Sequence, residues 1–415
     1  MMRMPQTTRF AIAASVTLLL AGCNFFTTPK DGPSVQLTAL PRALTADEVR
    51  VSSAANQFSF TLFQRLNAAE PEKNVFVSPL SVSFSLGMAM NGASTTTLDQ
   101  MRETLGFGAD ELATINQGYR GLIDLEAGLD KSTTFQIANS VWYRQSFPFN
   151  AAFIDQVREA FDAQVNASPF DATTVTAVNN WVSDRTNGKI PTVLERIEDA
   201  HVMFLINAIY FKGSWREQFD PKHTMSMPFN GKDGVQTVAT MVRRPKTGKV
   251  RMAQSGEATI GELSYGNGAF VMTILMANQG SINDIAAGLD TARWSALVSS
   301  MHEGEYAVQL PKFRMAYERE LNADLKALGM VVPFDETQAD FSKMTAEQVF
   351  ISFVKHKTFV DVNEEGTEAA AVTVTGMEVT SMPPCLCVDR PFVFVIRERF
   401  SGTILFMGKI VNVPQ

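Results

Sequence analysis

The sequence predicts an α+β fold in which one large domain occupies residues 46–415. Helical and strand patterns follow one another irregularly, without the regular strand–helix alternation that builds a doubly wound parallel sheet. No internal repeat and no second linker interrupts the chain after residue 45. Hydrophobic residues make up 45% of the 415 residues, which is enough for a large core.

Helix signals occur early in the domain. Ser78 and Pro79 are typical of a helix start, with serine as the cap and proline in the first turn. Residues 80–86 then alternate with period two, as a strand would, but the cap and the following Met-Ala-Met favour a helix. The other predicted helices are 97–106, 112–126 and 150–162, the last with Phe153, Val157 and Phe161 on one face.

Strand signals are clearer than helix signals. Residues 204–211 form a nearly continuous apolar run, broken by Asn207, and are predicted to be a strand buried on both faces. Residues 308–310 form a shorter strand. Residues 392–396 and 404–411 are two apolar runs around a turn, which predicts a hairpin.

The composition excludes some partners. A net charge of −7 and a pI near 5.3 provide no basic surface for nucleic acid, and the scattered charges indicate an ordinary solvated surface. The 30 Phe residues, against 4 Trp and 6 Tyr, indicate that aromatic side chains mainly fill a core.

The N-terminus has the pattern of an export signal. Arg3 and Arg9 precede an apolar run over residues 10–20 that is too short to span a bilayer. The run ends at Leu-Ala-Gly-Cys23, which resembles the bacterial lipobox. The alternatives are an ordinary secretory signal and an uncleaved anchor.

The lipobox resemblance implies that residues 1–22 are removed and that Cys23 carries lipid. Acyl chains on Cys23 would hold the protein on a membrane, since each buried methylene contributes about 0.8 kcal/mol. Asn24 resembles the sorting residue of outer-membrane lipoproteins. We therefore expect a lipid-anchored protein of the outer membrane or cell surface, with residues 23–45, which contain several prolines, as a flexible tether.

The two remaining cysteines, Cys385 and Cys387, stand one residue apart. Side chains at positions i and i+2 of a strand are poor disulfide partners, and two cysteines do not complete a zinc site. They are therefore predicted to be two small, half-buried thiols, and packing alone is expected to hold the core.

Enzyme signatures are missing from the sequence. The four histidines, His201, His223, His302 and His356, have no metal-ligand spacing. No GxSxG elbow, P-loop or GxGxxG is present. We predict no catalytic residue, metal or cofactor, and a surface hydrolase is disfavoured.

The most informative segment is 362–375. It begins with acidic residues and Gly366, a residue suited to a hinge, and then becomes small and β-branched. In a strand drawn from Thr367 onward, Glu368 and Glu378 fall on one face and no glutamate falls on the other, which predicts one wet and one buried face. The face predicted to be buried contains Thr367, Ala369, Ala371, Thr373, Thr375 and Met377. The residues alone also allow an ordinary edge strand.

Several motifs, in order along the chain, resemble the serpin family from about residue 46 to the C-terminus. They are residues 74–81 (NVFVSPLS), 137–139 (IAN), 180–190 (NWVSDRTNGKI), 207–215 (NAIYFKGSW), 310–313 (LPKF), 363–371 (NEEGTEAAA) and the C-terminal set from 391 to 409. Two peripheral departures occur, at residues 276–278 and 412–414.

The resemblance implies a fold of three β-sheets and about eight or nine helices, with an exposed reactive-centre loop, in a monomer. It also implies inhibition of serine endopeptidases. The protease serine would attack the loop and form an acyl-enzyme. The freed segment from Thr367 would then enter the main sheet and distort the active site of the protease. The hinge implied by the family consists of Glu364, Glu365, Gly366, Thr367, Glu368, Ala369, Ala370 and Ala371.

Counting along the family loop gives Thr380–Ser381 as the cleaved bond, with Glu378 as the alternative primary residue. Thr380 is small and uncharged, which suits an elastase- or subtilisin-like pocket rather than the acidic pocket of trypsin. Cysteine proteases are a further class of target. The alternative within the family is a non-inhibitory binding or carrier protein, which the alanine-rich hinge disfavours.

Other roles follow from the resemblance by position. Four residues match a polar cluster beneath the strands that open, namely Ser78, Ser81, Asn207 and His356. Trp215 and Glu364 match the entrance through which the loop first inserts. The alternative for each of these residues is plain core packing.

Overall fold

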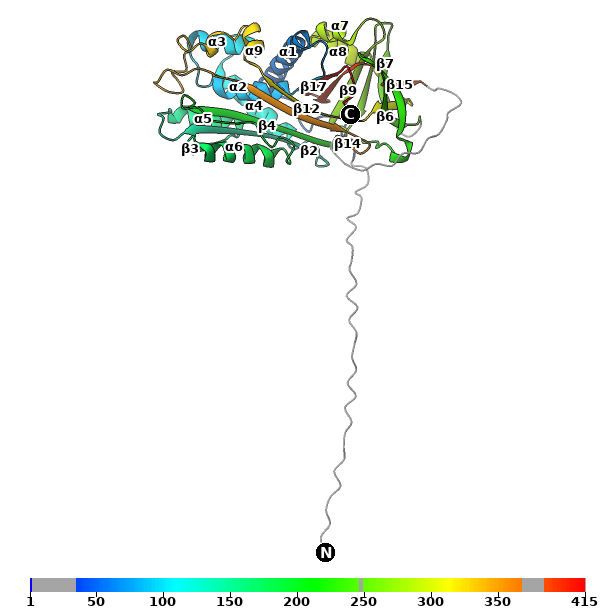
Figure 1. Ribbon diagram of the computed structural model, residues 1–415, viewed down its shortest axis with the longest axis horizontal. Helices are drawn as coiled ribbons and strands as arrows, with labels where there is room; N and C mark the ends of the chain where they lie inside the picture. The colour runs from blue at the N-terminus through cyan, green and yellow to red at the C-terminus, as the bar shows by residue number, and fades with distance from the viewer. Residues whose placement is uncertain (2–34, 246–248, 368–383, 415) are drawn as a thin grey trace. The chain divides into compact units, whose positions relative to one another are not determined.

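The structure is a computed structural model, and it describes residue 1 and residues 35–245, 249–367 and 384–414. All helices and strands below belong to the unit formed by residues 33–415. In the described part of the chain there are nine α-helices and three sheets, of six, seven and four strands (Figure 1). The predicted α+β class is confirmed.

The helices agree well with the sequence prediction. In α2 the Ser78 side chain accepts a hydrogen bond from the Ser81 amide and Pro79 is the first residue, so the predicted cap is confirmed. Every α2 residue except Ser85 is buried, and a helix buried on all sides shows no helical periodicity. The nine helices are α1 (Ala46–Ala69), α2 (Pro79–Met90), α3 (Thr95–Thr104), α4 (Leu112–Glu126), α5 (Ala151–Phe161), α6 (Ala172–Arg185), α7 (Ile282–Ala287), α8 (Thr291–Ser300) and α9 (Asn322–Ala327).

The six-stranded sheet has α2 on its inner side and α6 over its outer face (Figure 1). Its strands, in order across the sheet, are β12 (Phe313–Glu320), β13 (Lys355–Val362), β14 (Gly366–Thr367), β4 (Met203–Ser214), β2 (Thr133–Arg144) and β3 (Gln164–Ser168). β4 contains the strand predicted at 204–211. Its residues 208–211 are buried as expected, whereas residues 205–207 are only half-buried.

The seven-stranded sheet supplies most of the core. Its strands are β1 (Val75–Val77), β17 (Ile404–Ile410), β16 (Phe392–Glu398), β9 (Phe270–Ala277), β8 (Ala258–Ser264), β7 (Val250–Gln254) and β10 (His302–Gly304). β16 and β17 form the predicted antiparallel hairpin. Phe76 stacks between Phe394 and Phe406 at 5.5 and 5.4 Å between ring centroids, which confirms that phenylalanine fills the core.

The sequence prediction for the two cysteines is wrong in the four-stranded sheet. Its order is β15 (Cys385–Cys387), β11 (Ala307–Pro311), β6 (Gly234–Arg243) and β5 (Met225–Gly231). Cys385 and Cys387 form a disulfide, so the prediction of two free thiols is wrong. Their Cα atoms are 5.2 Å apart, within the range that a disulfide bridges, because β15 is shorter here than an extended strand.

Part of the segment predicted as a tether contacts the folded unit. The Leu37 amide donates to the Asn267 carbonyl at 2.8 Å, and Leu37, Leu40 and Leu44 pack against the core. Within the ranges given above, no helix has the length and apolarity to cross a bilayer, and no cluster of His, Cys, Asp and Glu could hold a metal ion. Residues 2–34, with Cys23, lie outside the described residues.

Candidate functional site

The hinge lies where β13 and β4 approach each other. A tight turn after Val362 brings the chain back as β14, in which Thr367 pairs antiparallel with Val362 on one side and Gly213 on the other. A Cβ atom on Gly366 would lie 1.9 Å from the Gly213 carbonyl oxygen, so only glycine fits here. Thr367, predicted to enter the sheet after cleavage, is already there in the uncut chain.

Thr367 turns its side chain toward the core. It is 4% exposed, and its hydroxyl shares a hydrogen bond of 2.8 Å with the Tyr265 hydroxyl. Burial raises the pKa of Tyr265 above its ordinary value, so this hydroxyl keeps its proton. The face that begins with Thr367 is therefore the core face at this position, as its composition predicted.

The predicted entrance lies around Trp215. Its amide donates to the Glu365 carbonyl at 2.7 Å and its indole N–H donates to the Asn363 carbonyl at 2.9 Å. The indole ring stacks on Tyr265 with 4.5 Å between centroids and an angle of 13°. Trp215 thus binds the turn before the hinge and the tyrosine beneath it.

Glu364 is tied to two residues that the sequence reasoning missed. Its carboxylate accepts from the Thr224 hydroxyl at 2.6 Å and pairs with Lys312 at 2.8 Å. Burial would raise the pKa of Glu364, but the hydrogen bonds from Lys312 and Thr224 outweigh burial, and the pKa lies below its usual value. Lys312 stood in the LPKF motif, whereas Thr224 and Tyr265 lay in no recognisable pattern.

Beyond β14, along β4 toward Met203, the six-stranded sheet is open. In the described residues β13 and β4 are joined only through β14, and two cavities lie between them. A small one of about 20 Å³ lies against Thr367, and a large one of about 700 Å³ continues from it. We call this gap, lined by residues 203–211 and 352–361, the slot. It explains why residues 205–207 of β4 are only half-buried.

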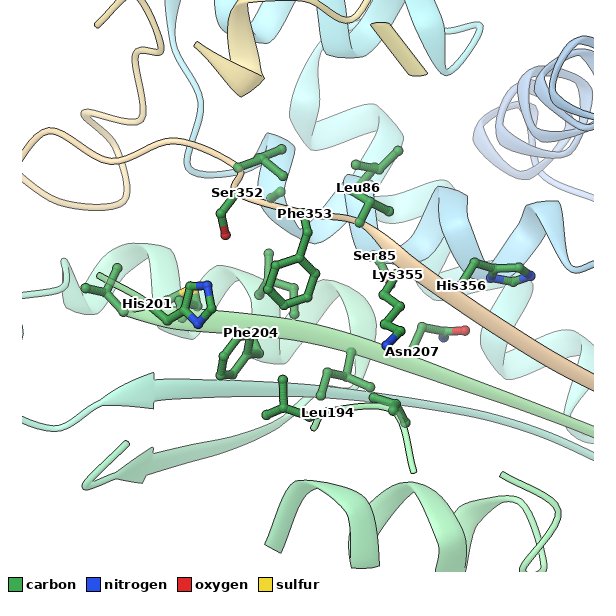
Figure 2. A pocket seen from close by; sticks show the side chains of 18 of the residues that line it. Ser85, Leu86, Leu194, His201, Phe204, Asn207, Ser352, Phe353, Lys355 and His356 are labelled. Atoms are coloured by element: carbon green, nitrogen blue, oxygen red, sulfur yellow. The ribbon is translucent and has the colours of Figure 1, made fainter. Parts of the chain in front are cut away.

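Figure 2 shows the large cavity from close by. Phe353, two residues before β13, and Lys355, its first residue, point toward Phe204 and Asn207 on β4. The wall toward α2 includes Ser85 and Leu86, and Leu194 closes the side toward α6. The lining is mostly apolar, as expected for a space between two layers of the core.

The four residues of the predicted polar cluster all line this cavity. Three of them are bonded together: the Ser78 amide donates to His356 Nε2 at 3.0 Å, and the Ser81 amide donates to Ser78 Oγ at 3.3 Å. Ser78 Oγ also donates to the Leu405 carbonyl at 2.8 Å. His356 is buried, and burial lowers its pKa to about 4, so it accepts as a neutral ring.

Asn207, the fourth member, is bonded elsewhere. Its side-chain amide donates to Asn139 Oδ1 at 2.8 Å, and Asn139 donates to the Phe161 carbonyl. Asn207 Oδ1 is buried without a hydrogen-bond partner among the described residues. Asn139 belonged to the IAN motif, so the sequence had marked it without indicating its role.

The remaining predicted site residues fall outside the described part of the chain. These are Cys23, the hinge residues Glu368, Ala369, Ala370 and Ala371, and the predicted reactive bond Thr380–Ser381 with its alternative Glu378. Their roles stay predictions.

The family model described as "Serpin (serine protease inhibitor)" matches residues 53–413. The chain belongs to the serpin family. It is similar to human serpin B8, at 33% identity over 367 residues that cover 86% of this chain and 97% of serpin B8. It is also similar to the human leukocyte elastase inhibitor, at 32% identity over 382 residues, or 87% and 98% of the two chains.

The solved structures agree with the predicted serpin fold. Human thyroxine-binding globulin superposes with a TM-score of 0.80 at 27% identity, covering 89% of this chain and all of that one. The predicted fold of three sheets with about nine helices is confirmed. Because one of these serpins is named as an elastase inhibitor and another as a thyroxine-binding globulin, membership in the family does not by itself decide between inhibitor and carrier.

Proposed function

We propose that this serpin inhibits serine endopeptidases with small, uncharged primary specificity by inserting its cleaved loop into the slot. The proposal depends on the observation that Gly366 and Thr367 are already paired in the sheet, at the end of the open slot nearest Gly213. A strand that continued from Thr367 would have unpaired edges of β4 and β13 on either side.

The observed register supports this. Thr367 pairs with Gly213 and Val362, so in an antiparallel continuation Ala371 would lie between Ile209 and Thr358. Thr373 would lie between Asn207 and His356, and its hydroxyl would face the unpaired Asn207 Oδ1. The inserted strand would thus supply a partner that the uncut chain lacks.

The energy of insertion is large. Pairing of residues 368–377 with residues 203–212 of β4 would add about ten ladder positions, each worth about 0.5–1.5 kcal/mol per hydrogen bond. Filling the cavity of about 700 Å³ adds burial of the small apolar side chains. Together these contribute on the order of 10 kcal/mol, available only after the loop is cut.

Incubation with an elastase-like protease and with trypsin, followed by denaturing electrophoresis, tests the proposal. We expect a covalent adduct with the elastase-like enzyme, formed through Thr380. Protein cut at Thr380–Ser381 should melt about 13 °C higher, since 10 kcal/mol is divided by an unfolding entropy of about 2.1 cal/mol/K per residue over roughly 370 residues.

The hinge offers a matched pair of variants. Thr367→Arg places a long charged side chain in the core and should convert the inhibitor into a substrate, with at least tenfold less adduct. Glu365→Arg, two residues earlier, changes an exposed side chain and should inhibit like the wild type. Clean cleavage of the wild type without adduct or thermal gain would instead indicate a carrier.

We also propose that lipid on Cys23 anchors the protein to a bacterial membrane, at the outer membrane or cell surface. The support is the Leu-Ala-Gly-Cys sequence after a short apolar run. Mass spectrometry of the mature N-terminus should find an acylated Cys23, and Cys23→Ser should move the protein to the soluble fraction. An unmodified N-terminus elsewhere would contradict this.

A further inference from the structure

The disulfide lies in the edge strand of the four-stranded sheet. In the described residues β15 has one neighbour, β11, to which Cys385, Leu386 and Cys387 pair in parallel. The backbone bonds that hold it include the Ala307 amide to the Pro384 carbonyl at 3.0 Å and the Val388 amide to the Gln309 carbonyl at 2.8 Å. β15 is therefore an edge strand, with ladder hydrogen bonds on one side among the described residues.

The side chains of β15 divide between core and solvent. Leu386 is fully buried, and a Cβ atom on Gly261 of β8 would lie 2.5 Å from its methyl carbon, so Leu386 fills the space that this glycine leaves. Cys385 and Cys387 flank it and are half-buried. In a strand, residues at i and i+2 share one face, so both sulfur atoms lie on the face opposite Leu386. The disulfide therefore lies on the face of β15 that points away from the core, between two half-buried residues.

The strand is also contracted at the disulfide. A regular strand separates residues i and i+2 by about 6.4–6.8 Å, whereas the Cα atoms of Cys385 and Cys387 are 5.2 Å apart. Reduction permits β15 to extend, which shifts its carbonyls and amides relative to those of β11. The redox state of the pair thus changes the pairing of the strand that follows the 368–383 segment.

We propose that Cys385–Cys387 is a thiol–disulfide exchange site that reacts with dithiol reductants in the folded protein and, when reduced, loosens β15 from β11. A thiolate of the dithiol attacks one sulfur and forms a mixed disulfide, while the other cysteine leaves as a thiolate and takes up a proton. The second sulfur of the dithiol then displaces the first cysteine. The dithiol is oxidised to a disulfide, and the protein gains two electrons and two protons.

The proposal does not depend on protease inhibition, and its test needs no protease. The full chain is treated with dithiothreitol without denaturant, quenched with an alkylating agent and mapped by peptide mass, so that Cys23 is counted separately. We expect both Cys385 and Cys387 to be alkylated after dithiothreitol and neither before it. Alkylation only after denaturant is added, or full alkylation in the untreated protein, would overturn the proposal.

Hydrogen exchange tests the conformational part. The amides of Ala307 and Val388, which join β15 to β11, should exchange at least tenfold faster in the reduced protein. The Cys385→Ser/Cys387→Ser variant should exchange like reduced wild type and should not respond to dithiothreitol. If that variant fails to fold, reduced and alkylated wild type replaces it. Unchanged exchange after complete reduction would show that the site does not control β15.

Discussion

The hydrogen bond between Thr367 and Tyr265 provides a direct test of whether the hinge occupies the sheet before cleavage. Thr367→Val keeps the shape of the side chain and removes the hydroxyl, which leaves the buried Tyr265 hydroxyl without the partner it has at 2.8 Å. An unsatisfied buried hydroxyl costs about 1–3 kcal/mol. Tyr265→Phe removes the other partner and should cost a similar amount.

The two substitutions should not add. Once one hydroxyl is gone, loss of the other also removes the unsatisfied buried group, so the double variant should be no less stable than either single variant. The coupling energy should therefore be at least about 1–3 kcal/mol. With an unfolding entropy of about 0.8 kcal/mol/K for a domain of this size, each single variant should melt about 1–4 °C below the wild type. Thermal melts of uncut protein at one fixed scan rate measure this.

The control is the same cycle in protein cut within the loop and fully inserted, where the pair should persist. Additive effects in the uncut protein, or no effect of Thr367→Val on its melting, would mean that Thr367 is outside the sheet. The reasoning about a hinge poised in the slot would then be wrong.

Three further predictions concern ionisable groups. Burial lowers the pKa of His356 to about 4, so the free energy of unfolding of the uncut protein should fall by about 3 kcal/mol as the pH drops from 6.5 to 4. His356→Gln should flatten that slope in thermal melts across pH. Burial and the charge of Glu398 raise the pKa of Glu126 to about 8, so the free energy of unfolding should fall as the pH rises from 4.5 to 8. Glu126→Gln should raise the melting temperature by about 4 °C at pH 7 and leave it unchanged at pH 4. Equal gains at the two pH values would contradict this prediction. Lys312→Met removes the ion pair of buried Glu364 and should lower the melting temperature of uncut protein by several degrees, whereas the additional change Glu364→Gln should recover part of the loss.

Local signals in the sequence predicted local features well. The cap at Ser78 identified α2 although the residues behind it alternate like a strand, because a cap depends on one side chain and one amide. Gly366 was predicted to be a hinge residue from its neighbours alone, and the approach of the Gly213 carbonyl explains why only glycine fits at this position. Motif order along the chain indicated the family and through it the three sheets.

Features that depend on distant residues could not be predicted. Thr224 and Tyr265 reach the hinge from 140 and 102 positions away, and nothing in their own surroundings indicates that they would. The slot depends on the separation of two strands about 150 residues apart, which no local pattern reports. The disulfide was missed for a related reason: an ideal strand was assumed for Cys385–Cys387, and the real strand is contracted.

The direction of β4 determines where a captured protease would come to rest. Met203 lies ten positions from Gly213, which is about 33 Å along a strand. Near the N-terminus of the folded chain, the Leu37 amide donates to the carbonyl of Asn267. Asn267 lies two residues from Tyr265, which shares a hydrogen bond with Thr367. In a lipid-tethered molecule the far end of an inserted strand would therefore lie about one strand length from the point where the tether joins the fold.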